Sequence, residues 1–257
     1  CLVGSEMCIR DRMYGDKKRF YQGHHTTSRY RHNNDMLGFL TDPDALNKRL
    51  ENQNFKVYLQ AKIDVEDCSM AGAEALVRYQ DEDGSIIAPD KFIPVLEDTY
   101  LISKIDYYVF EEVCRTLSDW AGQGKTVFTI SSNFSRTTFM GDHFIQRIEA
   151  ISDKYHVQRK YLEIEITESV NFTDVDTLVK RIDQIRNSGF RVAMDDFGVE
   201  NSNLALLSFV KFDILKIDKE FVKDIISNRR AQIIIGTMTK MCSEMGIQLI
   251  AEGIENE

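Results

Sequence analysis

Short apolar segments alternate with longer amphipathic segments along most of the chain. The apolar segments are rich in β-branched and aromatic residues and predict strands at 55–63, 71–79, 126–133, 161–167, 190–195, 213–217 and 247–252. The amphipathic segments predict helices at 45–52, 90–96, 103–120, 142–154 and 174–187, one helical turn at 204–209, and a helix at 220–245 that is interrupted near Asn228. Such alternation is typical of a parallel α/β architecture.

The number of predicted strands favours a TIM-like (β/α)8 barrel that lacks its last βα unit. An open doubly wound sheet is the alternative, but no Gly-x-Gly-x-x-Gly follows the first strand, which weakens a dinucleotide-binding interpretation. A barrel without its last unit has two strand edges with unpaired backbone groups. We therefore expect this chain by itself to be unstable or inactive.

Charge, hydropathy and cysteine usage exclude several classes of function. The net charge of -9 argues against a broad nucleic-acid-binding surface, so we expect neither DNA nor RNA as a partner. No apolar run approaches the roughly 20 residues that cross a bilayer, so we expect no membrane contact from this fragment, although a parent protein could be membrane-anchored. The five cysteines show no Cys-x-x-Cys spacing, which predicts reduced thiols in a cytoplasmic protein.

Three ranges divide the chain. Residues 1–12 read CLVGSEMCIRDR, which fits neither a signal peptide nor a capped helix and resembles a translated sequencing adapter, so we leave them out of the fold prediction. Residues 13–50 begin with Met-Tyr-Gly-Asp-Lys-Lys, which resembles the last helix of a GGDEF domain, and continue into a linker and a helix. Residues 51–257 form the main domain.

Polar residues stand at the carboxyl ends of six successive predicted strands. Each by itself could cap a helix or face solvent. In a parallel barrel, however, these strand ends meet at one end, where active sites of such barrels lie. In chain order the residues are Glu74, Asn133, Glu165 with Glu168 shortly after it, Asp195 with Asp196, Lys216, and Glu252.

Carboxylate and amide oxygens predict a metal site. Hard oxygen ligands without cysteine or histidine favour Mg²⁺ or Mn²⁺ over zinc. Two such cations, about 3.5–4 Å apart, suit phosphodiester displacement, and Asp195 would bridge them. A cation beside Lys216 would disfavour its charged form, so that Lys216 could orient or deprotonate the attacking water. The alternative for Lys216 is a structural ion pair with Asp195 or Asp218.

The motifs taken together resemble the EAL family of cyclic di-GMP phosphodiesterases, from about Leu50 to the end of the chain. Their order and spacing match that family's pattern. The motifs are Glu74-Ala75-Leu76 with Arg78, Asn133-Phe134-Ser135, Glu165-Ile166-Thr167-Glu168, Asp195-Asp196-Phe197-Gly198, Leu215-Lys216-Ile217-Asp218, and Ala251-Glu252-Gly253-Ile254-Glu255.

The resemblance implies hydrolysis of cyclic di-GMP to linear pGpG by a barrel of the EAL type, whose first strand is antiparallel. It implies that one metal is bound by Glu74, Asn133, Glu165 and Asp195, and the second by Asp195 and Asp196. Glu252 would support the second metal or its water, and Lys216 would act on the attacking water. Glu168 would anchor the loop after the fifth strand.

The resemblance also implies substrate contacts and a partner. Arg78 would contact a phosphate, while Gln60 and Asp106 match the family's positions at the edge of the substrate. A homodimer through the EAL domain is expected on the same ground.

Three departures from the family's pattern concern the first strand, the loop after the Asp pair and the chain's end. Gln-Ala stands at 60–61 where the family has Gln-Pro, and the glutamine that the family carries beyond Glu252 is absent. The loop after the Asp pair reads Glu-Asn-Ser-Asn at 200–203 where the family has Gly-Tyr-Ser-Ser. The alternative function is therefore a catalytically weak or inactive domain that acts as a cyclic di-GMP receptor.

Overall fold

A computed structural model describes residues 2–8, 38–167, 175–198, 204–223 and 225–254 of the chain. The predicted loop at 199–203 and Glu168 lie outside these described residues. The strands are β1 (Leu2–Cys8), β2 (Phe55–Ile63), β3 (Met70–Gln80), β4 (Ile86–Ile87), β5 (Thr129–Asn133), β6 (Leu162–Thr167), β7 (Arg191–Phe197), β8 (Ile214–Ile217) and β9 (Gln248–Ala251).

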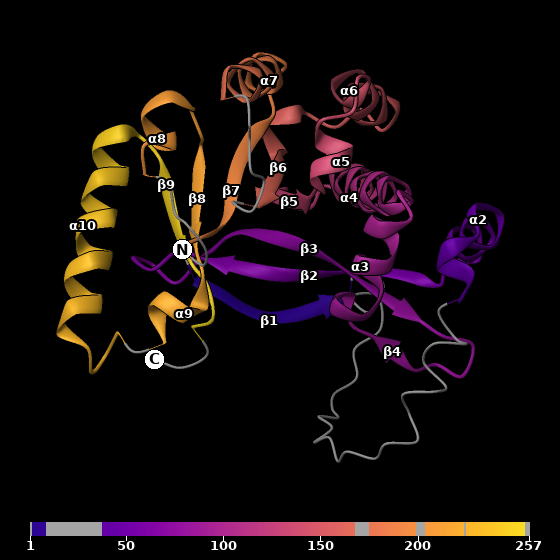
Figure 1. The fold of residues 1–257 in the computed structure, drawn as a ribbon, viewed down its shortest axis with the longest axis horizontal. Helices are drawn as coiled ribbons and strands as arrows, with labels where there is room; N and C mark the ends of the chain where they lie inside the picture. The colour runs from indigo at the N-terminus through magenta and orange to yellow at the C-terminus, as the bar shows by residue number, and fades with distance from the viewer. Residues whose placement is uncertain (1, 9–37, 168–174, 199–203, 224, 255–257) are drawn as a thin grey trace.

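Helices follow most of the strands and lie around the sheet (Figure 1). The larger helices are α2 (Pro43–Glu51), α3 (Pro89–Asp98), α4 (Ile102–Gly122), α6 (Phe144–Lys154), α7 (Val175–Asn187) and α10 (Arg229–Met245). Short turns are η2 (Gly38–Thr41), α5 (Arg136–Phe139), η3 (Arg159–Tyr161), α8 (Leu206–Phe209) and α9 (Lys219–Val222). No helix within the described ranges is long and apolar enough to span a membrane.

The sheet closes on itself. Its order is β2-β1-β9-β8-β7-β6-β5-β3-β4, and β2 also pairs with β3. Strands β3 and β5 to β9 run parallel to their neighbours in this series, whereas β2 is antiparallel to β3. This confirms the TIM-like barrel and the antiparallel first strand that the EAL resemblance implied. The open doubly wound alternative is wrong because β2 hydrogen-bonds to β3 at one side of the series and reaches β9 through β1 at the other.

The structure differs from the expectation of two unpaired strand edges. Leu2–Cys8, which the sequence analysis left out of the fold, forms β1 between β2 and β9. Its register against β2 runs from Leu2 opposite Ile63 to Cys8 opposite Tyr58, whereas it meets β9 only at Ala251. Open backbone donors and acceptors on two facing edges favour pairing with any segment of suitable length. The hydrophobic pattern gave no sign of this pairing, because apolar and polar residues do not alternate regularly along β1.

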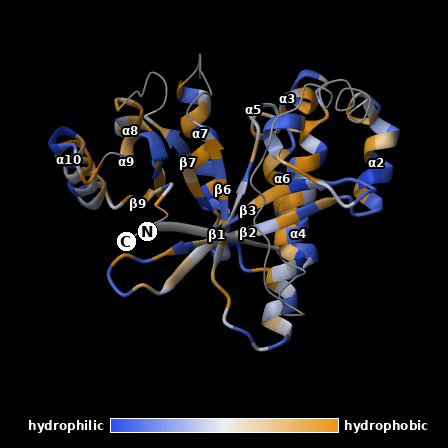
Figure 2. Cartoon of the chain, turned by 90° about the horizontal axis from the view of Figure 1, so that it is seen from below, coloured by the Kyte–Doolittle hydropathy of each residue, from blue (hydrophilic) through white to orange (hydrophobic). Residues whose placement is uncertain are grey.

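The main core lies between the outer face of the barrel and the helices. Successive strand residues point to opposite faces, and the outward positions are apolar, as with Ile130 on β5, Ile164 on β6 and Val192 on β7. They pack in one cluster with helix residues such as Phe110 of α4, and hydrophobic residues of α4 and the central strands lie side by side (Figure 2). The inward positions are therefore left for polar chemistry.

Candidate active site

Strand register brings the predicted acids together inside the barrel. Asn133 lies opposite Glu165 on the neighbouring strands β5 and β6, and Thr167 of β6 lies opposite Asp195 of β7. Glu74 on β3 is paired with Gln60 of β2, so these two side chains also share a face. Apart from Gln60, which lies on the antiparallel β2, these positions stand at or near the carboxyl ends of the parallel strands, as the sequence predicted for the acids.

Lys216 of β8 stands at the centre of the acidic cluster. Its Nζ lies 2.8 Å from Glu74 Oε2, 3.1 Å from Asp195 Oδ1 and 2.7 Å from Glu252 Oε1. It also forms an ion pair with Glu165 Oε1. The Lys216 side chain is fully buried. Of the two ion pairs that the sequence analysis considered, the structure has the one with Asp195, while Asp218 instead caps α9 by accepting from the Glu220 N–H.

The carboxylates around Lys216 determine its charge. Burial by itself would lower the pKa of Lys216, but Glu165, Glu74, Asp195 and Glu252 together raise that pKa well above its ordinary value. In this structure the ammonium is thus charged, and the expected weakening of its charge depends on a cation bound beside it.

The acids within the cluster titrate differently from one another. Burial would raise the pKa of Glu165, but Lys216 and then Lys62 hold it below its ordinary value. Burial and then repulsion from Glu165 raise the pKa of Asp195 well above its ordinary value. Burial also raises the pKa of Glu252, although Lys216 opposes it. The cluster therefore contains more negative charge than a single lysine neutralises.

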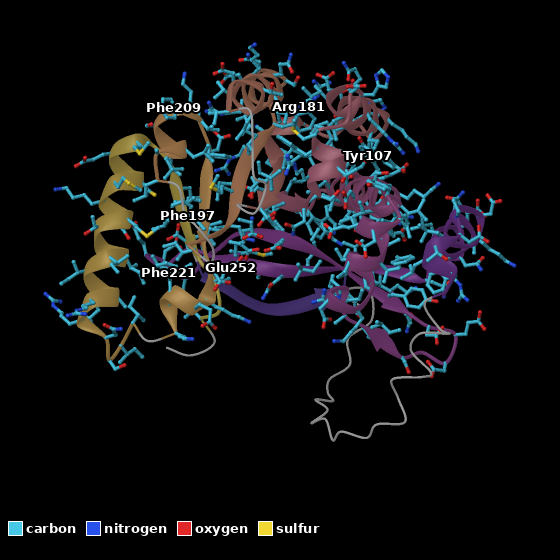
Figure 3. All side chains as sticks on the ribbon, in the orientation of Figure 1. Tyr107, Arg181, Phe197, Phe209, Phe221 and Glu252 are labelled. Atoms are coloured by element: carbon cyan, nitrogen blue, oxygen red, sulfur yellow. The ribbon has the colours of Figure 1, made fainter. Side chains whose placement is uncertain are left out.

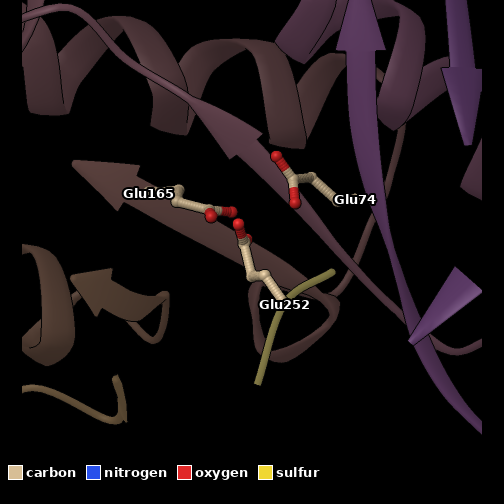
Figure 4. Close-up of side chains that lie close together, drawn as sticks. All are labelled: Glu74, Glu165 and Glu252. Atoms are coloured by element: carbon tan, nitrogen blue, oxygen red, sulfur yellow. The ribbon is translucent and has the colours of Figure 1, made fainter. Parts of the chain in front are cut away.

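Two overlapping groups of acids have the arrangement of a metal site. Glu74, Glu165 and Glu252 form one group, and their carboxylates point toward one another (Figure 4). Asp195, Asp196 and Glu252 form the other, and in each group the ligand atoms lie within 4.8 Å of one another. Glu252 belongs to both groups, and Asp195, which sequence reasoning placed between the two cations, belongs to the second group and also lies with Glu74 and Glu165 around Lys216.

The residues fit a hard divalent cation. Both carboxylate oxygens of Glu165 are buried, and neither accepts a hydrogen bond of ordinary geometry from the described residues. Such acceptors are costly to bury unless a cation or donor satisfies them. The oxygen-only donor set suits Mg²⁺ or Mn²⁺. Asn133 donates from Nδ2 to Glu74 Oε1 at 2.9 Å, which leaves its amide oxygen available as a ligand.

Backbone geometry at the end of β7 sets the direction of Asp195 and Asp196. Asp196 has a left-handed φ of 55°, and its N–H donates to Asp195 Oδ1 at 2.8 Å. Gly198 follows with φ +107°, and a Cβ there would overlap the Phe221 ring of α9. Phe197, Phe221 and Glu252 lie in the same part of the molecule (Figure 3). The glycine is therefore needed both for its conformation and for close packing of α9.

A cavity of about 300 Å³ opens beside the acids. Asn133 and Asp106 both line it, together with apolar residues such as Leu76 and Ile105. Asp106 of α4 is buried and its Oδ2 accepts from the Ser135 N–H at 3.0 Å, Ser135 Oγ at 2.7 Å and Thr138 Oγ1 at 2.6 Å. Burial raises the pKa of Asp106 to about 6, although those hydrogen bonds oppose the shift.

The other two predicted substrate residues lie along β2 and β3. Gln60 is half-buried and lies opposite Glu74 on the neighbouring strand. Arg78 is on the same face of β3 as Glu74, four residues further on, and donates from Nη1 to the Val77 carbonyl at 2.9 Å. It does not line the cavity that contains Asp106.

Sequence reasoning missed a second set of buried polar residues below the acids. Lys62, Ser131 and Glu163 are each at most 2% exposed and contact one another inside the barrel. Ser131 and Glu163 stand two positions before Asn133 and Glu165 on their strands, and Lys62 stands two positions after Gln60 on the antiparallel β2. The period of two along each strand was the signal that could have found them.

The closed α/β barrel with acidic residues at its strand ends defines the class of the protein, and comparisons with known proteins define the family. A family model described as the EAL domain matches residues 44–257. The chain belongs to the EAL domain family.

Named relatives and a solved structure agree with this assignment. The signaling protein YkoW of Bacillus subtilis is 31% identical over 95% of this chain, and the probable cyclic di-GMP phosphodiesterase PdeA of Escherichia coli is 31% identical over 68%. A structure titled PaMucR phosphodiesterase, c-di-GMP complex is 27% identical, with a TM-score of 0.76 over 83% of this chain and 87% of that one. The chain spans 30% of the length of YkoW and 24% of that of PdeA.

Proposed function

We propose that this domain hydrolyses cyclic di-GMP to linear pGpG with Mg²⁺ or Mn²⁺ as its cofactor. The observation that carries the proposal is the buried cluster in which four carboxylates surround Lys216 at the carboxyl ends of the strands. Relatives named as cyclic di-GMP phosphodiesterases support the choice of substrate. The four carboxylates carry more negative charge than Lys216 neutralises. The cluster therefore suits cations, which in turn can bind a phosphodiester.

The proposal assigns ligands from both acidic groups. Glu74, Asn133, Glu165 and Asp195 would hold one cation, and Asp195, Asp196 and Glu252 the other. Bound there, the cations would polarise the phosphoryl group and lower the pKa of the attacking water.

The chain's own groups would orient the reactants. Lys216 is held in place by its carboxylate contacts and can donate to the water or to a phosphate oxygen. The cavity lined by Asp106 and apolar side chains suits one planar base of the substrate, and Arg78 would reach a phosphate.

A turnover assay on the purified domain tests this function. We expect cyclic di-GMP to be converted to pGpG in the presence of Mn²⁺ and no conversion after chelation. Glu74→Ala and Asp195→Asn should each reduce turnover by at least about 100-fold, because each removes a cation ligand, while circular dichroism shows a retained fold. Unchanged turnover in either variant would refute the ligand assignment. Binding of cyclic di-GMP by the wild type without any pGpG would instead identify a receptor.

A further inference from the structure

Lys62 is a second buried lysine inside the barrel, and its partners lie on strands that carry proposed metal ligands. Its Nζ donates to Glu163 Oε2 at 2.8 Å on β6 and to Ser131 Oγ at 2.9 Å on β5. Lys62 and Glu163 are each 2% exposed, and Ser131 is fully buried. A lysine is seldom buried to this degree unless its charge is paired.

The ion pair with Glu163 does not by itself account for Lys62. Glu163 already has a second cation, because Arg191 Nη1 donates to Glu163 Oε1 at 2.8 Å. The Arg191 side chain is about one-third exposed, whereas that of Lys62 is almost fully buried. Glu163 carries one negative charge and contacts two cations, so one positive charge is left over. The other hydrogen-bond partner of Lys62 is Ser131.

Ser131 connects Lys62 to the level of the metal ligands. Side chains two residues apart on a strand point to the same side, so Ser131 lies beneath Asn133 and Glu163 lies beneath Glu165. Because Lys62 donates to the oxygen of Ser131, the hydroxyl hydrogen must point away from Lys62. Both oxygens of Glu165 are buried, Oε1 forms an ion pair with Lys216, and neither has a hydrogen bond of ordinary geometry within the described residues.

We propose that Lys62 is a positioning residue that orients the Ser131 hydroxyl toward Glu165 and thereby holds Glu165 in place as a metal ligand. The inference rests on the proposed metal site of the preceding subsection. Groups that orient a ligand from behind typically change metal affinity 10–100-fold when they are removed.

Mn²⁺ binding to the metal-free protein, measured by titration calorimetry, tests the proposal without reference to turnover. We expect Lys62→Met to weaken Mn²⁺ binding by about tenfold or more. Ser131→Ala, which removes no charge, should weaken it by a similar factor. The double variant should be no weaker than the single variants, because both act through one hydrogen-bond chain. Ser131→Thr retains the hydroxyl and should therefore keep most of the Mn²⁺ affinity that Ser131→Ala loses.

Arg191→Met is the matched control, because it also takes one cation from Glu163 but leaves Lys62 and Ser131 in contact. We expect it to lower the melting temperature while Mn²⁺ affinity stays within about twofold of the wild type. Unchanged or tighter Mn²⁺ binding in Lys62→Met would overturn the proposal, since loss of a nearby positive charge alone would tighten binding. An equal loss of affinity in Arg191→Met would overturn it too.

The same titrations separate this inference from the proposed function. If the wild type hydrolyses cyclic di-GMP and Lys62→Met binds Mn²⁺ normally, only the role of Lys62 is wrong. If the wild type binds Mn²⁺ without hydrolysing cyclic di-GMP, and Lys62→Met binds it more weakly, only the proposed function is wrong.

Discussion

At the scale of single residues, burial and neighbouring charge decide the chemistry of Lys216. Its ammonium is the counter-ion of four carboxylates, and those of Glu74, Asp195 and Glu252 lie within 3.1 Å of Nζ. Breaking a buried charge network by removing one sign leaves uncompensated charge and typically costs about 3–5 kcal/mol. Lys216 is therefore a structural counter-ion as well as a candidate catalytic group.

The counter-ion role predicts that metal can compensate for the loss of Lys216. In the presence of a chelator, Lys216→Met should lower the melting temperature strongly, because the carboxylates around position 216 then repel one another without any cation between them. Added Mn²⁺ should raise the melting temperature of this variant more than that of the wild type. Scanning calorimetry with chelator and with Mn²⁺ measures both shifts, and equal shifts in the two proteins would contradict the prediction.

Asp106 predicts a pH dependence of stability. Its pKa in the folded protein is about 6 against an ordinary value of 3.8, so the folded state holds the proton more firmly than the unfolded state. The stabilisation from this group is full below pH 3.8 and is lost as the pH rises through about 6. Asp106→Asn should remove this part of the pH dependence, about 1–3 kcal/mol in the free energy of unfolding between pH 4 and pH 7.

Denaturant unfolding of the two proteins at several pH values measures the effect. Asp119→Asn on the same helix is the matched control, because Asp119 is exposed and should leave the pH profile of the wild type unchanged. If the free energy of unfolding of Asp106→Asn changed with pH in parallel with that of the wild type, the pKa of Asp106 would not be raised by folding.

At the scale of elements, the short helix α9 depends on the glycine after β7. Gly198→Ala places a methyl group against the Phe221 ring and forces alanine to φ +107°. We expect this change to lower the free energy of unfolding by about 1–3 kcal/mol. It should also lower turnover, because Asp195 and Asp196 end the same strand.

A second variant and a control separate the overlap with Phe221 from the backbone strain at position 198. Gly198→Ala with Phe221→Leu should recover only part of the stability, because it relieves the overlap and leaves the strained φ. Gly236→Ala, on a helical glycine of α10 with no atom within 4 Å of the added Cβ, should be neutral or stabilising by up to about 1 kcal/mol. Urea unfolding of the three proteins measures these differences, and a Gly198→Ala protein as stable as the wild type would disprove the packing argument.

At the scale of the whole molecule, closure of the barrel depends on β1. This strand lies between β2 and β9, which would otherwise present unpaired edges to solvent. A chain without residues 1–8 should therefore melt at a lower temperature and self-associate through the exposed edges. Calorimetry and analytical ultracentrifugation of the shortened and full chains measure the two effects. Identical behaviour of both chains would instead favour the expectation that residues 1–12 have no part in the fold.

The sequence by itself determined the class of fold and the membership of the acidic cluster. Helical and strand periods are local properties, so the strands around Ile164 and Val192 could be located from their apolar residues alone. Acids placed after such strands must meet at one end of a parallel barrel, which is why Glu74, Glu165 and Asp195 all contact Lys216.

Only the tertiary structure decided how the cluster is arranged and supported. Strand register between distant segments places Lys216 among its carboxylates, puts Glu252 in both metal groups, and sets Lys62 with Ser131 below Glu165. Glu74 and Lys216, for example, are 142 positions apart in the sequence. No local pattern encodes such distances. The pairing of β1 was hidden for the same reason, because a strand is accepted at an open edge by backbone hydrogen bonds, which all residues except proline can form.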